Sequence, residues 1–252
     1  MMDRRDVLKG AASVSLATIL ADPRLARAAA SGLHEYTVNT PGGQRVSGAL
    51  ALPRGVPAPT VVLIHEWWGL NDQIRAVTAE LGRQGYLALA VDLMDGKVAA
   101  TPDEARALTQ AVRPERAIDT LVGWIEWLRV HDACNRKIGT LGWCFGGGWS
   151  LAAAIATPVE ATIVYYGRVT QKAAELAALK GPVLGHFATR DKFITPAMVA
   201  DWEAEMRLAG KAFETHWYDA DHAFANPTGA AYDAPDAALA WDRSLAFLDR
   251  HL

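Results

Sequence analysis

The chain has 252 residues and a formal net charge of −3; 51% of its residues are hydrophobic and 21% are charged. This composition excludes an intrinsically disordered chain and gives no basis for a nucleic-acid-binding face. Two cysteines are too few for a disulfide framework, and the sequence has no Cys or His cluster with metal-ligand spacing. We therefore expect a globular protein that needs no metal or other cofactor and binds no nucleic acid.

Residues 1–30 have the pattern of an export signal. Asp3-Arg4-Arg5-Asp6-Val7-Leu8-Lys9 resembles a twin-arginine motif, a mildly apolar stretch follows at 11–21, and Ala26-Arg27-Ala28 fits a small-residue cleavage site. The apolar stretch is too short to span a membrane. We predict a signal peptide over 1–30, export by the Tat machinery, and a periplasmic mature protein that lies in no membrane. The alternative is an amphipathic N-terminal helix of a cytosolic protein.

The remaining residues, 31–252, fit one domain with a single α/β fold. An antiparallel hairpin is predicted around Pro41-Gly42-Gly43, and from residue 60 on short apolar runs alternate with segments of helical spacing. The predicted strands are 35–39, 45–52, 60–64, 86–91, 138–142, 162–166, 183–188 and 213–218. The predicted helices are 72–84, 149–156, about 170–180, about 196–209, 235 to the C-terminus, and two that begin at Thr101, with a capping box to Glu104, and at Pro114. This alternation predicts a mostly parallel sheet of about eight strands with helices on both faces.

The stretch Gly142-Trp143-Cys144-Phe145-Gly146-Gly147 joins the predicted strand at 138–142 to a helix of small residues. In so tight a strand-to-helix turn the central residue is strained, and glycines are needed where a Cβ would collide. Unpaired N–H groups at the first turn of a helix favour a thiolate, and the N–H of Phe145 points to where an oxyanion would form. We therefore predict that Cys144 is the nucleophile of an acyl-transfer site; the alternative is a buried structural thiol.

Polar residues directly follow four predicted strands, at the sheet edge where chemistry collects in parallel sheets. They are Glu66, Cys144, Asp191 and His222. Cys, Asp and His come in the nucleophile–acid–base order of a catalytic triad. His222 is predicted to carry the proton between the thiol and the leaving group, and Asp191 to hold its tautomer.

Other ionisable residues near these positions are weaker candidates. Asp219 and Asp221 are alternative candidates for the acid that orients His222. Adjacent side chains on an extended segment point in different directions, so Asp191 is preferred. His65, His186 and His216 lie inside apolar runs, which favours packed, neutral imidazoles.

Six motifs together resemble the dienelactone hydrolase family of α/β-hydrolases over most of residues 31–252. They are His65-Glu66-Trp67-Trp68-Gly69-Leu70, Val91-Asp92-Leu93, Gly142-Trp143-Cys144-Phe145-Gly146-Gly147, Tyr165-Tyr166-Gly167, Arg190-Asp191 and His222-Ala223-Phe224. The resemblance implies an α/β-hydrolase fold and hydrolysis of a small ester or lactone through an acyl-thiol intermediate. It also implies that Glu66 contacts the nucleophilic thiol and helps to form the thiolate, and that the N–H groups of Phe145 and Trp67 form the oxyanion hole.

Two positions depart from the founding lactonases of the family, which place arginines on a substrate carboxylate. Gly96 and Asn226 stand at these positions. Lys97, Arg168, Arg190 and Lys192 are the other cations that could bind a substrate carboxylate, but none stands at the position of a family arginine. Aromatic residues are instead predicted around the mouth of the site, with Trp68, Trp143, Tyr166 and Phe224 as the substrate pocket and Trp67 and Trp149 nearby. We therefore expect a substrate without a free carboxylate.

Two functions from different classes fit the sequence. The first is a monomeric cysteine hydrolase of an ester or lactone. The second is a thiol-based redox or binding protein that keeps the fold without turnover. The triad favours the hydrolase, because a binding role has no use for His222 and Asp191. Cys134, predicted in the loop before the strand at 138–142, is expected to be a free thiol like Cys144.

Overall fold

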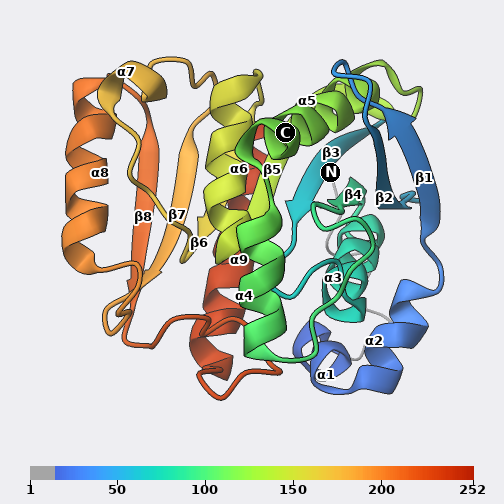
Figure 1. Ribbon diagram of the computed structural model, residues 1–252, viewed down its shortest axis with the longest axis horizontal. Coiled ribbons are helices and arrows are strands. Elements are labelled where there is room, and N and C mark those ends of the chain that lie inside the picture. The colour runs from blue at the N-terminus through green and yellow to red at the C-terminus, as the bar shows by residue number, and fades with distance from the viewer. Residues whose placement is uncertain (1–14) are drawn as a thin grey trace, which may run out of the picture.

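The computed structural model describes residues 15–252, so the predicted twin-arginine motif lies outside the described residues. Within them, eight strands form one sheet in the order β1-β2-β4-β3-β5-β6-β7-β8 (Figure 1). The pairs β1–β2 and β2–β4 are antiparallel, and all other neighbours are parallel. The strands are β1 (His34–Asn39), β2 (Arg45–Ala51), β3 (Ala58–Ile64), β4 (Leu87–Val91), β5 (Cys134–Trp143), β6 (Ala161–Tyr165), β7 (Val183–Ala188) and β8 (Phe213–Tyr218). The predicted mostly parallel, eight-stranded α/β fold is confirmed.

Helices cover both faces of the sheet. The helices are α1 (Leu16–Ala21), α2 (Pro23–Ala30), α3 (Asp72–Arg83), α4 (Pro102–Ala111), α5 (Pro114–Val130), α6 (Phe145–Ala156), α7 (Ala173–Leu176), α8 (Pro196–Leu208) and α9 (Ala234–His251). Apolar side chains of α1, α3 and α9 form one buried cluster with the sheet, and those of α5, α6 and α8 form the other. Each inner strand therefore lies between two apolar layers, which is why β4, β6 and β7 are buried along their whole length.

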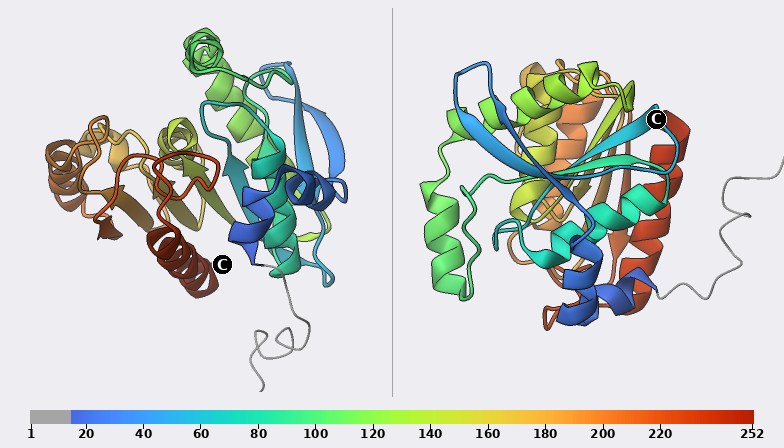
Figure 2. Two further views of the ribbon diagram at one scale, coloured as in Figure 1. Left: turned by 90° about the horizontal axis from the view of Figure 1, so that it is seen from below. Right: turned by 90° about the vertical axis from the view of Figure 1, so that its right-hand side faces the viewer.

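The segment before β1 packs against the outer side of α3. Ile19, Leu20 and Ala26 are buried there, and α1 and α2 lie beside α3 in both views of Figure 2. Part of the predicted signal peptide is thus helical and in contact with the domain. Its cleavage after residue 30 stays a prediction. No helix within residues 15–252 combines the length and the apolar character needed to cross a bilayer.

Apart from the earlier start of α6, at Phe145 rather than at residue 149, three elements differ from the sequence prediction. β5 begins at Cys134 rather than at residue 138, because Ala58 of β3 pairs with Cys134 across a register shift. The added residues are mostly exposed and polar, so no apolar run announced them. α7 has four residues where a helix over about 170–180 was predicted. The N–H of Ala173 donates to Glu205 of α8 at 2.8 Å and fixes the start of α7, and the Gly181-Pro182 pair favours an extended chain into β7.

The third difference concerns the start of α4. Thr101 caps the helix by accepting from the N–H of Glu104 at 3.3 Å, as predicted. The Glu104 carboxylate, however, accepts from the N–H of Ala100 at 2.8 Å, one residue before the N-cap. Both side chains still satisfy backbone donors at the helix start, so the cap stabilises α4 by a variant of the predicted box.

Candidate active site

Cys144 is the N-cap of α6 and has φ 51° and ψ −114°, a left-handed backbone that non-glycine residues rarely adopt. The turn is tight because α6 starts against the end of β3. A Cβ on Gly142 would lie 2.0 Å from the carbonyl oxygen of Gly146, and one on Gly146 would lie 2.2 Å from that of Ile64. The glycines on either side of the cysteine are therefore required for this turn. Such strain, held by surrounding structure, is typical of functional sites.

The structure brings Cys144, His222 and Asp191 together from three separate strand ends. His222 Nε2 lies 3.2 Å from Cys144 Sγ, and His222 Nδ1 lies 2.6 Å from Asp191 Oδ2. The other Asp191 oxygen accepts from the N–H groups of Phe193 and Ile194 at 2.8 and 2.9 Å. The Asp191 side chain is completely buried, so these donors fix the carboxylate and, through it, the imidazole.

The rival carboxylates lie elsewhere. Asp219 and Asp221 both form ion pairs with Arg190, and both side chains are exposed. Their role in the structure is a surface network, so Asp191 is the acid that orients His222.

The environment of His222 favours its charged form. Burial by itself would lower the pKa of His222, but the hydrogen bonds and charges of Asp191 and Cys144 raise the pKa to about 10. The raised pKa favours an imidazolium, which would donate from Nδ1 to Asp191 and from Nε2 to Sγ. This arrangement stabilises negative charge on the sulfur and supplies a proton for a leaving group.

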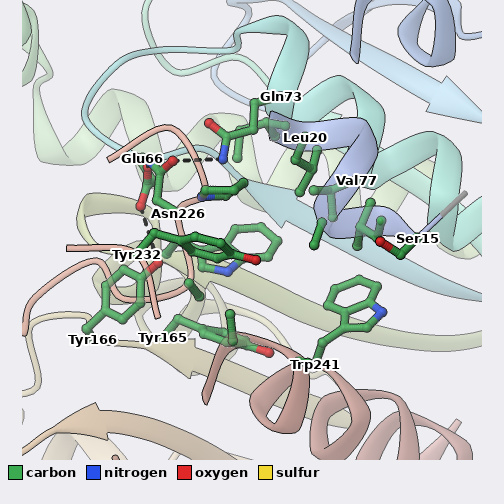
Figure 3. A pocket seen from close by; sticks show the side chains of 18 of the residues that line it. Ser15, Leu20, Glu66, Gln73, Val77, Tyr165, Tyr166, Asn226, Tyr232 and Trp241 are labelled. Atoms are coloured by element: carbon green, nitrogen blue, oxygen red, sulfur yellow. Dashed lines mark hydrogen bonds between the residues drawn. The ribbon is translucent and has the colours of Figure 1, made fainter. Parts of the chain in front are cut away.

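Glu66, directly after β3, is buried beside the triad. Its Oε2 accepts from Asn226 Nδ2 at 2.5 Å, and its Oε1 accepts from the Tyr166 hydroxyl at 3.4 Å. Asn226 is held in turn, because its Oδ1 accepts from Gln73 Nε2 at 3.0 Å (Figure 3). The hydrogen bonds of Glu66 thus run to these partners rather than to the thiol. Burial raises the pKa of Glu66 to about 7, against the opposing effects of Asn226, His222 and Tyr166.

The comparisons with known proteins agree with this geometry. A model of the dienelactone hydrolase family matches residues 46–252. The chain belongs to the dienelactone hydrolase family. It is 30% identical over 217 residues to a carboxymethylenebutenolidase of Pseudomonas putida, with 82% of this chain and 92% of that one covered. Carboxymethylenebutenolidase 1 of Cupriavidus pinatubonensis is 26% identical over 216 residues, at the same coverage.

Solved structures give the same fold. A Klebsiella pneumoniae protein assigned as a dienelactone hydrolase has a TM-score of 0.77 at 25% identity and covers 87% of this chain and 99% of its own. A dienelactone hydrolase-like promiscuous phosphotriesterase from metagenomic libraries has a TM-score of 0.79 at 20% identity, again over 87% and 99%. The chain is therefore a carboxymethylenebutenolidase-like hydrolase with an α/β-hydrolase fold.

The two segments that carry the expected oxyanion donors are neighbours in this dienelactone hydrolase family member. Phe145 is the first residue of α6, where the backbone N–H has no partner within the helix. Trp67 follows Glu66 at the end of β3. The close approach of Gly146 to the carbonyls of Ile64 and His65 places the two segments side by side.

The aromatic residues predicted around the mouth of the site lie in different environments in the structure. Trp67 and Trp68 pack edge to face, with ring centres 4.9 Å apart and both side chains half-buried. Phe224 is fully buried and packs 5.4 Å from Tyr166, so it supports the site from behind. Trp149 packs into the apolar layer on the opposite face of the sheet.

Trp143 and Tyr166 line a cavity of about 290 Å³ that the Glu66 side chain also borders. Of the other lining residues, Asn226 holds this carboxylate and Gln73 holds Asn226, a role for the two amides that the sequence did not predict. An amide pair carries no sequence signal for such a role, because Asn and Gln are common on any surface loop or helix.

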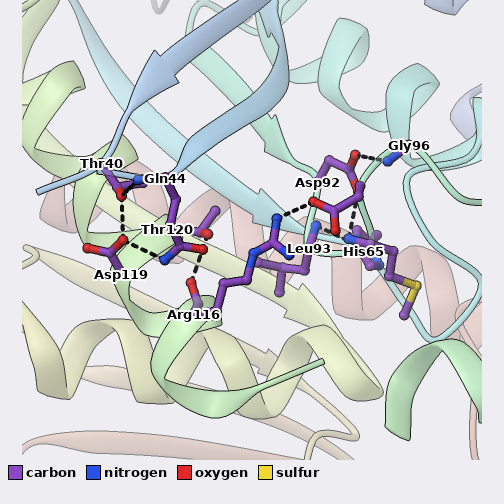
Figure 4. A network of polar contacts seen from close by, with 11 residues as sticks. Thr40, Gln44, His65, Asp92, Leu93, Gly96, Arg116, Asp119 and Thr120 are labelled. Carbon is purple, nitrogen blue, oxygen red and sulfur yellow. Dashed lines mark hydrogen bonds and ion pairs between the residues drawn. The ribbon is translucent and has the colours of Figure 1, made fainter. Parts of the chain in front are cut away.

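In this hydrolase no cationic side chain stands at the two positions where the founding lactonases of the family place arginines. The N–H of Gly96 donates to Asp92 in a short loop that His65 also supports, as its Nε2 accepts from the N–H of Leu93 at 3.2 Å (Figure 4). Burial lowers the pKa of His65, which makes it a neutral structural imidazole. Of the other cations, Arg190 pairs with two aspartates, and Lys97, Arg168 and Lys192 are exposed. Across residues 15–252, no group of three Cys, His, Asp or Glu side chains could hold a metal.

Proposed function

We propose that this hydrolase cleaves a small ester or lactone with Cys144 as the nucleophile and an acyl-thiol intermediate. The observation that carries the proposal is the line of contacts from Cys144 Sγ through both nitrogens of His222 to the buried Asp191. A thiol, a proton carrier and an orienting carboxylate in hydrogen-bond contact are the parts that nucleophilic acyl transfer needs.

In the first half of the reaction Sγ attacks the substrate carbonyl carbon. The carbonyl oxygen becomes an oxyanion and accepts hydrogen bonds from the N–H groups of Phe145 and Trp67. The tetrahedral intermediate collapses, the C–O bond to the alcohol breaks, and His222 Nε2 gives its proton to the alkoxide. A lactone substrate keeps its alcohol tethered at this point. The product is a thioester on Cys144 and a neutral imidazole.

In the second half water attacks the thioester carbon and gives a proton to His222 Nε2. The C–S bond breaks, the carboxylic acid leaves, and the thiolate–imidazolium pair is restored. Asp191 holds Nδ1–H throughout, so that Nε2 stays available for both proton transfers. Glu66, with its pKa raised by burial to about 7, is a second proton acceptor beside the site.

The direct test removes the nucleophile. Cys144→Ala is expected to abolish hydrolysis of p-nitrophenyl acetate, and Cys144→Ser to leave a trace, because an alcohol is hardly ionised at neutral pH. Cys134→Ser is the matched control, since Cys134 lies at the opposite end of β5 and should keep wild-type kcat/KM. Intact-mass spectra of the wild type quenched during turnover should show one acetyl group that the Cys144 variants lack. Wild-type turnover by Cys144→Ala would end the proposal.

We propose further that the substrate carries no free carboxylate near the reacting carbonyl. A carboxylate that enters a partly closed pocket loses water, and an arginine normally offsets this loss by two charge-assisted hydrogen bonds. Asn226 is committed to Glu66, and Gly96 has no side chain. Neutral aryl esters and lactones should therefore have a kcat/KM about tenfold above that of carboxylated dienelactones, about 1.4 kcal/mol of transition-state binding. A clear preference for the carboxylated lactone at equal ionic strength would show that an exposed cation has taken over this role.

The site of action is proposed to be the periplasm, with residues 1–30 as a twin-arginine signal that is removed after export. The support is the sequence pattern described above. Expression in a Gram-negative host, followed by fractionation and intact-mass measurement, is expected to give a periplasmic protein that lacks these residues. A cytoplasmic protein that keeps them would exclude the proposal.

A further inference from the structure

A chamber lies behind the catalytic side chains, between α3 and α9 on one face of the sheet. Its floor is made by Trp143 and Tyr165, at the ends of β5 and β6, and Trp241 of α9 forms one side. Leu20 and its neighbours on α1 close the outer side (Figure 3). The chamber has a volume of about 290 Å³.

The walls of the chamber are mainly apolar, whereas its inner end is polar. The rings of Trp143, Tyr165 and Trp241 offer flat apolar surface, whereas the inner end carries the Glu66 carboxyl and the Asn226 amide. Among the lining residues that the structure describes, no side chain is cationic, and the charged ones, Glu66 and Asp242, are both acidic. An anion would meet no partner here, and burying an unpaired charge is costly, so a neutral ligand fits.

The volume sets the size of that ligand. An engineered cavity of about 150 Å³ lined by apolar side chains takes one benzene ring. A chamber of about 290 Å³ therefore has room for two fused rings with one hydroxyl group. The hydroxyl would lie at the inner end, where the Glu66 carboxyl can accept a hydrogen bond, since Asn226 Oδ1 already accepts from Gln73 and Thr228.

The chamber is separate from the reacting atoms. Its lining includes neither Cys144 nor His222, although Glu66, Trp143 and Tyr166 border both the chamber and the active site. Occupation of the chamber therefore does not depend on a reactive thiol.

We propose that, in the chain that still carries residues 1–30, this chamber is a binding site for a neutral bicyclic aromatic alcohol, with α1 as its outer wall. The ligand stacks on Trp143 and Trp241 and places its hydroxyl against Glu66. The proposal rests on the cavity and its lining and not on the hydrolase mechanism.

Titration calorimetry with 1-naphthol on the full-length chain, with residues 1–30 verified by intact mass, tests this site. The wild type is expected to bind one equivalent. Ala237→Leu adds bulk to the lining from α9 and is expected to raise Kd about tenfold or more, because the ligand then clashes with the added side chain. Ala234→Leu is the matched control, since residue 234 lies on the same helix, is exposed and lies outside the lining.

A second pair of variants tests the role of α1. Ala17→Leu fills the chamber from an exposed position, so it leaves the core intact, and Ala21→Leu on the same helix is its control. Ala17→Leu should also raise Kd, whereas Ala21→Leu should not.

The Cys144→Ala variant separates this proposal from the proposed reaction, because it should bind 1-naphthol with wild-type affinity even though it does not turn over. Absence of binding to the wild type, or equal Kd for the wild type and both filling variants, would overturn the chamber as a ligand site.

Discussion

Replacing Glu66 by glutamine is expected to stabilise the protein at alkaline pH while leaving it nearly unchanged in acid. Burial is the main cause that raises the pKa of Glu66 from 4.5 to about 7. Since one pKa unit corresponds to about 1.4 kcal/mol, ionising Glu66 costs the folded protein about 3 kcal/mol more than it costs the unfolded chain. The folded state binds this proton more tightly, so its contribution to stability is complete below pH 4.5 and is lost as the pH rises through about 7.

Urea unfolding at about pH 5 and about pH 8.5 measures this difference. Glutamine keeps the shape of the side chain and an oxygen that accepts from Asn226, but it does not ionise. At about pH 5 the two proteins should agree within about 1 kcal/mol, and at about pH 8.5 Glu66→Gln should be more stable by up to about 3 kcal/mol. Glu126→Gln, at an exposed position of α5, is the control and should show no such pH dependence. If the difference in unfolding free energy between Glu66→Gln and the wild type is the same at both pH values, burial does not raise the pKa of Glu66.

The same variant reports on the reaction. Removing a proton acceptor beside the thiol without changing the shape of the site should slow single-turnover acylation by about tenfold to a hundredfold. Unchanged acylation would reduce Glu66 to a buried structural carboxyl.

Three further predictions follow from the site. Asp191→Asn should lower kcat by about a thousandfold or more with little change in KM, because the imidazole loses the partner that fixes its tautomer; a small effect would assign that role to another acid. Native iodoacetamide labelling should modify the half-buried Cys144 and spare the buried Cys134, and both should react after denaturation; a link between them in the non-reduced protein would contradict the length of β5. Gly146→Ala should destabilise the fold by more than about 3 kcal/mol in thermal unfolding, since its Cβ would lie 2.2 Å from a backbone oxygen of β3; a normal melting temperature would refute the packing of this turn.

The sequence by itself predicted the sheet and the three polar residues, Cys144, Asp191 and His222, that the structure brings into contact. Apolar runs alternating with helical spacing specify buried parallel strands, because only such strands must be apolar on both faces. Glycines two positions before and after Cys144 indicate a turn that has no room for a Cβ on either side of the cysteine. Asp191 and His222 were found because parallel strands bring their carboxyl ends to one edge of the sheet, whatever their separation in the chain.

The tertiary structure alone decided how Glu66 is held and where the apolar chamber lies. Asn226 is 160 residues away from Glu66 in the sequence, and an amide gives no pattern by which such a contact could be recognised. The sequence also could not predict the direction of an aromatic ring. Phe224 packs behind the site, and Trp149 packs in the apolar layer on the other face of the sheet. Ring orientation depends on which strands and helices are neighbours, and neighbours are chosen by packing of the whole chain.

The N-terminal segment shows most clearly which properties the sequence indicates and which only the tertiary structure decides. Its composition, with paired arginines, a short apolar stretch and small residues, indicates an export signal. Only the structure shows that Leu20 and its neighbours on α1 also cover the chamber between α3 and α9. A local pattern records the properties of one segment, whereas a cavity is formed by distant segments that share no pattern and meet only in the folded protein.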